Sequence, residues 1–340
     1  MPEKKLIKKT FILILIILIY FLICEQIVRV EFFGMNAFSP RLMENIQFST
    51  TYEFLEGDCD MKAKYSDYYK GAFFETNSIG IRDKEYNLEK NNNTFRIAII
   101  GDSQTKGIGI NLEDTYPKIL EKKLNEKTIN KSYEVMNFAR GGIHNENYQC
   151  YLKKTIDALH YNPDMIILQL YQYNKFFENT TQLKNIEKYD ENAYFIIMFF
   201  DKNNNYIEKY QNLTDIPIVS LNVSHTKKDL VYPADWHFNE EIHLNIANSL
   251  NDYLIFNEEY IYEQTKNLTK AKNLPELIKP PVAKPIKNSK TGFEKLYYVE
   301  KIEKRFGINF ILKKAYELSA KMKEKSKTYD KIIIKIKRII

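Results

Sequence analysis

Short apolar runs alternate with longer amphipathic stretches between Thr94 and Leu254, and this alternation constrains the fold more than any other feature of the sequence. The apolar runs have the length of strands and carry few charges, which is typical of strands buried on both faces. The stretches between them have the period of helices that pack on such a sheet. We expect strands at 95–100, 133–138, 164–170, 194–200 and 216–221, and helices at 113–125, 146–160 and 240–254, the last capped by Asn239. The pattern predicts an α/β protein whose parallel sheet is covered by helices on both faces.

The composition fits a folded protein with a sizeable core. The chain has 340 residues, enough for one large or two modest domains. A hydrophobic content of 44% excludes a wholly disordered protein, and the presence of only 11 Gly and 10 Pro excludes collagen-like or low-complexity sequence. Three cysteines, at 24, 59 and 150, are too few and too scattered for a disulfide framework or a CxxC-type zinc site. Cys59 and Cys150 could pair outside the cytoplasm, although their spacing does not indicate it.

Charge is distributed unevenly along the chain. Residues 265–340 hold 21 Lys and Arg against 7 Asp and Glu, which leaves 29 against 37 in the rest of the sequence. The net charge of +6 therefore combines a strongly basic tail with an acidic remainder. We expect five parts: a basic end with a membrane anchor at 1–30, a lead-in segment at 31–93, an α/β domain at 94–263, a Pro- and Lys-rich linker at 264–292, and a basic helical tail at 293–340.

The N-terminal end reads as a membrane-targeting element. Four lysines within the first nine residues precede an uncharged run from Thr10 to Cys24. Fifteen residues fall short of the roughly 20 that cross a bilayer core, so a span would extend to about Val28. No small-residue cleavage site follows, which favours a retained anchor over a cleaved signal peptide, and a buried core helix is the plainer alternative. The lysines predict a cytoplasmic N-terminus, with the chain from about residue 30 onward outside the cytoplasm.

The C-terminal tail has two interpretations that the sequence leaves open. Four prolines among lysines between Leu274 and Lys290 resist regular structure and indicate a linker. The helix-like sequence after Phe293 ends in a basic and apolar run at 331–340. Such a run suits an amphipathic segment held to an anionic membrane surface or polymer. It suits equally well a solvated basic helix that packs on the domain.

Chemically active residue types follow the expected strands. In open parallel sheets ligands bind beyond the carboxyl ends of the strands. Ser103 follows the first strand in the turn Gly-Asp-Ser-Gln-Thr, Arg-Gly-Gly at 140–142 follows the second, and Asn174 follows the third. Asp235-Trp-His237 stands before the last helix. Taken singly these are ordinary caps, turns and loop residues, but together they supply the parts of an acyl-transfer site.

Each of these residues has a role in acyl transfer. The Ser103 hydroxyl is a poor nucleophile unless a base accepts its proton, and His237 is the candidate base. Asp235 could hold the imidazole in the required tautomer. The backbone N–H groups of Ser103 and Gly142 and the side-chain amide of Asn174 would form an oxyanion hole.

The same segments, in this order, resemble the sequence blocks of the SGNH hydrolases, also called GDSL-type esterases and lipases. The resemblance covers roughly residues 75–255 and rests on 101–109, on 137–142, on 170–174, on 235–247 and on the approach at 76–82. It implies a three-layer α/β/α, flavodoxin-like parallel sheet. It also implies that Ser103 is the nucleophile, that Asp235 and His237 complete the triad, and that Gly142 and Asn174 stabilise the oxyanion. Lys175 and Ile242 depart from the blocks at positions that supply no catalytic group.

Two enzymatic functions and one non-enzymatic function remain open. The first is an extracytoplasmic serine esterase that hydrolyses an O-acyl ester of a small molecule or a cell-surface glycan. The second is an O-acyltransferase that passes the acyl group from Ser103 to a sugar hydroxyl and needs a membrane partner as acyl donor. The third is a binding protein that uses its basic tail. A dinucleotide-binding domain is excluded because Gly101, Gly107 and Gly109 do not form GxGxxG. We expect no metal, cofactor or nucleic-acid partner.

Overall fold

The structure of the protein is a computed structural model. It describes residues 2–38, 55–56, 59–127, 131–141, 149–170, 180–200, 210–221, 223, 226–233, 235–271, 274–277 and 279. The expected tail at 293–340 and most of the expected linker therefore lie outside the described residues.

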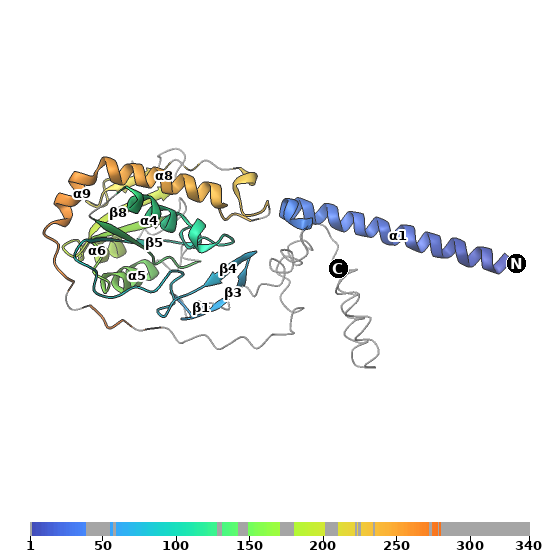
Figure 1. Ribbon diagram of the computed structural model, residues 1–340, viewed down its shortest axis with the longest axis horizontal. Helices are drawn as coiled ribbons and strands as arrows, with labels where there is room; N and C mark the ends of the chain where they lie inside the picture. The colour runs from blue at the N-terminus through green and yellow to red at the C-terminus, as the bar shows by residue number, and fades with distance from the viewer. Residues whose placement is uncertain are drawn as a thin grey trace. The chain divides into compact units, whose positions relative to one another are not determined.

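A five-stranded parallel sheet forms the centre of the α/β domain (Figure 1). Its strands lie in the order β6, β5, β7, β8, β9, so the first strand of the sheet along the chain pairs with both the second and the third. This is the flavodoxin-like order, which confirms the predicted fold class. The strands are β5 (Thr94–Ile100), β6 (Ser132–Asn137), β7 (Met165–Leu170), β8 (Tyr194–Phe200) and β9 (Ile218–Leu221).

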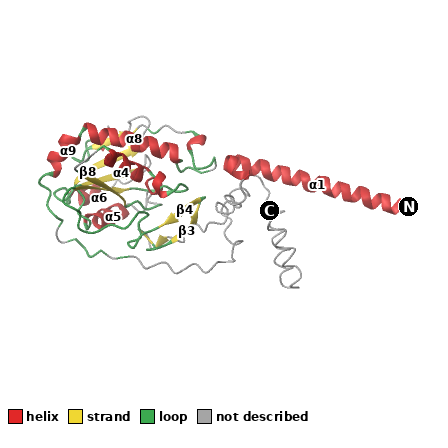
Figure 2. Cartoon of the chain, viewed as in Figure 1, coloured by secondary structure: helices red, strands yellow, loops and turns green. Residues whose placement is uncertain are grey.

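Helices cover both faces of the sheet, as predicted (Figure 2). One face packs against α4 (Tyr116–Glu126), α8 (Glu240–Phe256) and α9 (Glu258–Thr265). The other packs against α5 (Gln149–Leu159) and α6 (Thr180–Glu187). Alternate residues of β5 take part in the two cores, Ile97 and Ile99 on the first face and Ala98 and Ile100 on the second. The side-chain alternation of a strand buried on both faces accounts for the continuous apolar runs.

The expected element boundaries need small corrections. The helix expected at 113–125 is a 3₁₀ turn, η2 (Leu112–Asp114), followed by α4, because Thr115 is extended and Pro117 fits the first turn of a helix. The cap of α8 is confirmed, since the Asn239 side chain accepts a hydrogen bond from the Ile242 N–H at 3.2 Å. Three described helices, α3 (Ser103–Lys106), α6 and α9, are absent from the sequence-based prediction.

The lead-in segment holds two antiparallel hairpins. The first pairs β1 (Leu55–Glu56) with β2 (Asp60–Met61), and the second pairs β3 (Ser66–Tyr69) with β4 (Ala72–Glu75). In the second hairpin Tyr69 lies opposite Ala72, and the two turn residues Lys70 and Gly71 have φ angles of 52° and 91°. Positive φ at both turn positions matches the twist of a two-residue hairpin. These strands are too short to show a periodic hydrophobic pattern in the sequence.

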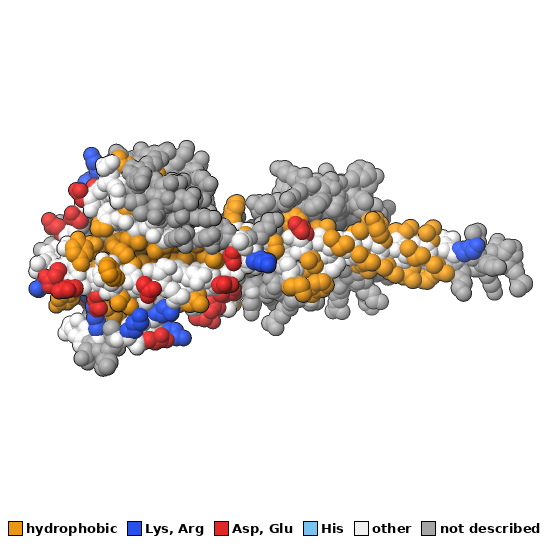
Figure 3. Space-filling model, turned by 90° about the horizontal axis from the view of Figure 1, so that it is seen from above, with side chains coloured by type: hydrophobic (Ala, Val, Ile, Leu, Met, Phe, Trp, Pro, Cys, Tyr) orange, Lys and Arg blue, Asp and Glu red, His pale blue; other side chains and the backbone are white. Residues whose placement is uncertain are grey.

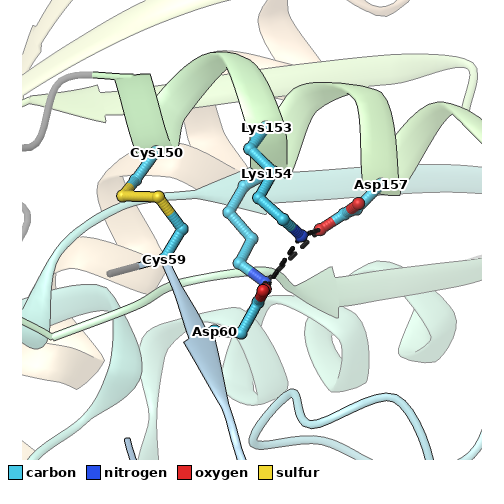
Figure 4. Close-up of a disulfide and its surroundings, with 6 residues drawn as sticks. All are labelled: Cys59, Asp60, Cys150, Lys153, Lys154 and Asp157. Carbon is cyan, nitrogen blue, oxygen red and sulfur yellow. Dashed lines mark hydrogen bonds and ion pairs between the residues drawn. A yellow bond between two sulfur atoms is a disulfide. The ribbon is translucent and has the colours of Figure 1, made fainter. Parts of the chain in front are cut away.

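A disulfide fastens this lead-in segment to the α/β domain (Figure 4). It joins Cys59, just before β2, to Cys150 in α5, across 91 positions of the sequence. Beside it, the Asp60 carboxylate accepts hydrogen bonds from Lys153 at 2.9 Å and Lys154 at 2.8 Å. The structure thus forms the pairing that the spacing of the cysteines left open.

Removal of this disulfide should lower the free energy of unfolding by about 2–5 kcal/mol, because a cross-link over so long a loop restricts the unfolded chain. The double variant Cys59→Ala/Cys150→Ala, compared with the parent in urea denaturation, measures the loss. Cys24→Ser is the matched control, since Cys24 in the N-terminal helix α1 (Pro2–Phe33) is the remaining cysteine and forms no disulfide. Equal urea midpoints for the double variant and the control would contradict the prediction.

The N-terminal helix α1 (Pro2–Phe33) carries the expected apolar run and continues into a 3₁₀ turn, η1 (Gly34–Phe38). Within the described residues it is the one helix long and apolar enough to cross a membrane, over Lys9–Phe33, which extends beyond the expected end near Val28. From Phe11 to Ile23, and again at Ile27, its hydrophobic side chains lie exposed along its surface (Figure 3), whereas Phe32 and Phe33 are buried. A signal sequence has the same properties, so the helix is a candidate for either role.

Candidate active site

Ser103 lies at the carboxyl end of β5, as the first residue of a one-turn helix, α3 (Ser103–Lys106). The chain between strand and helix is tightly held. A Cβ atom on Gly101 would lie 2.2 Å from the Thr105 hydroxyl oxygen, so only glycine fits there. Asp102 caps the helix by accepting a hydrogen bond from the Gln104 N–H at 2.8 Å. Because the helices that follow β5 and β6 cover opposite faces of the sheet, Ser103 stands at the topological switch point, where such folds place their ligands.

Asp235 and His237 form the predicted pair. The Asp235 Oδ1 atom is hydrogen-bonded to His237 Nδ1 and also accepts the backbone N–H groups of Trp236 at 2.7 Å and His237 at 2.9 Å. The Asp235 side chain is 1% exposed and His237 is buried. A carboxylate at Nδ1 favours the tautomer that carries its proton there, which leaves Nε2 free to accept a proton from a serine hydroxyl.

The electrostatics of the pair suit a neutral base beside an ionised acid. Burial lowers the pKa of His237 and outweighs the Asp235 hydrogen bond and charge, which raise it, while the charges of Lys70 and Lys106 lower it further. Burial would raise the pKa of Asp235, but the bond to His237 and the charges of His237 and Lys70 prevail and lower it. The imidazole is therefore uncharged and the carboxylate charged at neutral pH.

Gln104 links the turn at 101–105, which carries Ser103, to the loop at 235–238, which carries His237 and is called the histidine loop below. Its side-chain amide donates to the Trp236 carbonyl at 2.9 Å and accepts the Phe238 N–H at 3.0 Å. These two contacts clamp the residues on either side of His237 against the residue that follows Ser103. The structure thus brings the turn that carries Ser103 against the loop that carries Asp235 and His237, while the catalytic roles of these three residues stay predictions. The role of Gln104 could not be recognised from the sequence, since its hydrogen-bond partners lie more than 130 positions away.

The predicted oxyanion-hole residues Gly142 and Asn174 lie outside the described residues. Arg140 and Gly141, which directly precede Gly142, do lie near Ser103. The Arg140 N–H donates to the Gly101 carbonyl at 2.9 Å, and a Cβ atom on Gly141 would lie 3.8 Å from the Ser103 Cβ. Gly141 therefore lies close to Ser103, while the donor roles of Ser103, Gly142 and Asn174 stay predictions.

Two lysines that the sequence analysis did not identify also lie at the site. Lys106, the last residue of α3, is buried, and a Cβ atom on Gly141 would lie 2.7 Å from its Nζ. Burial, and then the charges of Arg82, Arg140 and Lys70, hold the pKa of Lys106 well below its ordinary value. The second, Lys70, donates a hydrogen bond to Asp235 Oδ2 at 2.7 Å.

The other residues noted near the site have structural or exposed positions. His243 is buried and accepts the Tyr116 N–H at 3.1 Å, while burial and the charge of Arg82 lower its pKa to about 3. Trp236 is 67% exposed, so it lines the outside of the histidine loop instead of the core. Among the described residues, no group of three or more His, Cys, Asp or Glu side chains is arranged to hold a metal ion.

Comparison with known protein families finds no match, and comparison with curated proteins finds none. Comparison with solved structures finds several. A lipolytic protein of the G-D-S-L family from Desulfitobacterium hafniense is 15% identical, with a TM-score of 0.36 over 46% of this chain and 98% of its own. A two-domain esterase active on acetylated mannans is 14% identical, with a TM-score of 0.38 over 54% of this chain and 53% of its own. A psychrotrophic esterase from Pseudoalteromonas is 20% identical, with a TM-score of 0.35 over 48% of this chain and 100% of its own.

Proposed function

We propose that this chain is a serine esterase of the SGNH type, which hydrolyses an O-acyl ester through Ser103, His237 and Asp235. One observation carries the proposal: the Gln104 side chain, next to Ser103, binds both neighbours of a buried His237 that is hydrogen-bonded to Asp235. A serine, a neutral imidazole and a buried carboxylate at one sheet edge are the parts that nucleophilic acyl transfer needs.

The reaction proceeds in two halves. The Ser103 oxygen attacks the ester carbonyl carbon while its proton passes to His237 Nε2, and the tetrahedral intermediate collapses as that proton moves to the departing alcohol. Water then attacks the acyl-serine, His237 takes its proton, and the carboxylic acid leaves as that proton returns to the Ser103 oxygen. Asp235 stabilises the imidazolium in both halves. The N–H groups of Ser103 and Gly142 and the Asn174 amide would bind the oxyanion.

We also propose that the domain works outside the cytoplasm, held by α1. Two observations support this placement. The Cys59–Cys150 disulfide persists in oxidising compartments, and α1 is apolar over a length that can cross a bilayer after four lysines. An ester on a cell-surface molecule would then be the substrate.

Hydrolysis of p-nitrophenyl acetate by the detergent-solubilised full chain tests the proposal. We expect turnover with release of acetate, and an alkyl phosphonate ester should label Ser103 covalently and stop it. The rate should fall as pH drops through the pKa of His237, because an imidazolium cannot accept the serine proton, and the midpoint should lie below about 6.5 because burial lowers that pKa.

Three results would argue against this esterase. They are phosphonate label on a residue other than Ser103, an acid midpoint above 6.5, and no turnover by folded protein. If an added glycan gains the acetyl group in place of water, the same residues support an O-acyltransferase instead.

A further inference from the structure

We propose that Lys70, at the tip of the β3–β4 hairpin, is a positioning residue of the Asp235–His237 pair, and that its ammonium group holds the Asp235 carboxylate in place beside the imidazole. The inference rests on the proposed esterase function. It assigns an active-site role to a hairpin that lies outside the α/β domain and some 165 residues before the pair in the sequence.

The geometry of the hairpin turn and its packing fix the position of Lys70. Tyr69 pairs with Ala72, so Lys70 and Gly71 form the whole turn, and both have positive φ. Tyr69 and Phe74 are buried together in a small core beneath the strands. A Cβ atom on Gly109 would lie 3.3 Å from the Lys70 carbonyl and 2.7 Å from a Val231 methyl group. The turn therefore packs closely against the segment after α3.

The histidine loop supports the same arrangement from the other side. The Val231 N–H donates to the His237 carbonyl at 2.9 Å, and Leu230 pairs with Phe238 in a β-bridge. Val231 also contacts Gly109 as described above. Val231 thus packs beside the hairpin turn and is also hydrogen-bonded to the loop that carries Asp235 and His237. This shared contact fixes the position of Lys70 relative to Asp235 and His237.

Lys70 completes the hydrogen bonding of the carboxylate. Asp235 Oδ1 accepts three N–H groups, two from the backbone and one from the His237 ring. Asp235 Oδ2 accepts the Lys70 ammonium at 2.7 Å, in a pair whose side chains are 12% and 1% exposed. Loss of Lys70 would leave this oxygen without its ammonium donor in a site that water reaches poorly, so the carboxylate would be free to turn.

Lys70 also acts on the charge state of the imidazole. Its Nζ lies 3.4 Å from His237 Nδ1. The groups that face His237 are Asp235 on its own loop, Lys70 on the hairpin, Lys106 at the end of α3 and the buried His243 on α8. Asp235 raises the pKa of His237, whereas burial, Lys70 and Lys106 lower it. The positive charge of Lys70 therefore disfavours protonation of His237, which extends the pH range over which His237 can act as a base.

Titration of His237 in the full chain tests this directly. Histidines labelled with ¹⁵N are followed by NMR against pH in the Ser103→Ala background, with His237→Gln as the assignment control. Lys70→Met should raise the pKa of His237 by about one pH unit or more, because a unit charge within a few ångströms acts strongly at a buried site. Lys70→Arg keeps the charge and should leave it near its original value.

Lys118→Met is the matched control. Lys118 binds Asp83 at 2.8 Å in a pair as buried as the Lys70 pair, with side chains 11% and 0% exposed. Among the described residues, it forms no hydrogen bond or ion pair with Ser103, Asp235 or His237. The variant Lys118→Met should lower the midpoint of thermal unfolding and leave the titration of His237 unchanged. An unchanged His237 titration in Lys70→Met, or a shift of equal size in Lys118→Met, would overturn the inference.

The activity profile gives an independent reading. With p-nitrophenyl acetate, Lys70→Met should move the acid limb of kcat/KM upward in pH by the same amount, and Lys70→Arg should restore it. A uniform loss of activity with an unmoved midpoint would show that Lys70 acts only on stability, and would overturn the inference. A failure of the proposed esterase is distinguishable, since it removes activity from the parent protein and leaves the NMR result intact.

Discussion

Replacement of Ser103 by alanine is expected to lower kcat for ester hydrolysis by a factor of about 10⁴ or more, the scale of effect seen when a triad nucleophile is removed. The physical reason is that no acyl-serine can form, so the remaining rate comes from water and from the oxyanion site alone. His237→Ala should cost a similar factor, because an unassisted hydroxyl is a weak nucleophile. The measurement is kcat for p-nitrophenyl acetate with the full chain at a pH above the acid limb.

The double variant Ser103→Ala/His237→Ala distinguishes a concerted site from two independent effects. Residues that act as a unit are not additive, so the double variant should be no slower than the poorer single variant. Ser78→Ala is the matched control, since the Ser78 hydroxyl binds Glu85 at the surface and, within the described part of the chain, forms no hydrogen bond with Ser103, Asp235 or His237. Retention of more than about a tenth of the activity in Ser103→Ala would point to another nucleophile.

The fold could be predicted from the sequence because its signals are local. The five strands are short apolar runs, and each run is long enough to identify without knowledge of its neighbours. The position of Ser103 follows in the same way, since the residues that form its turn, from Gly101 to Thr105, are consecutive. Strand order is different. It depends on which strands pair, and here the family resemblance supplied the flavodoxin-like order that the structure confirms.

The contacts that complete the site could not be predicted because they join distant residues. Gln104 binds backbone groups more than 130 positions away, Lys70 binds Asp235 across 165 positions, and Cys59 pairs with Cys150 across 91. In each case the residue type is ordinary for its local surroundings: a polar residue in a helix turn, a lysine in a hairpin turn, a cysteine before a strand. Lys70 and Cys59 acquire their roles from the packing of the hairpins against the α/β domain, and Gln104 acquires its role from the packing of the loop at 235–238 against α3.

Arg82 is the residue whose loss should destabilise the site most. Its guanidinium is buried and donates to four backbone carbonyls, those of Phe73 at 3.0 Å, Lys106 at 3.0 Å, Gly107 at 2.5 Å and Ile110 at 2.7 Å. One of these carbonyls belongs to the β3–β4 hairpin, one to Lys106 at the end of α3, and two to the segment directly after α3. Burial lowers the pKa of Arg82 to about 10, so it remains charged at neutral pH.

Arg82→Met is therefore expected to lower the free energy of unfolding by about 3–5 kcal/mol, since buried carbonyls that lose their donors each cost about 1–3 kcal/mol. Part of this cost is offset because a buried charge is also removed. Urea denaturation of the full chain measures it, with Lys84→Met as the control. Lys84 lies two positions away in an ion pair with Glu121 and its side chain is 51% exposed, so its loss should cost less than about 1 kcal/mol.

The same variant should also lose activity under conditions where it is still folded. Arg82 ties the hairpin that carries Lys70 to the residues that follow α3, so without it Ser103 and the Asp235–His237 pair are no longer held by a common support. A misplacement of about 1 Å can cost a hundredfold in rate. Arg82→Lys, which keeps a charge but cannot reach all four carbonyls, should fall between the parent and Arg82→Met in both stability and kcat. Full activity in a destabilised Arg82→Met would show that the hairpin is dispensable for placing the catalytic groups.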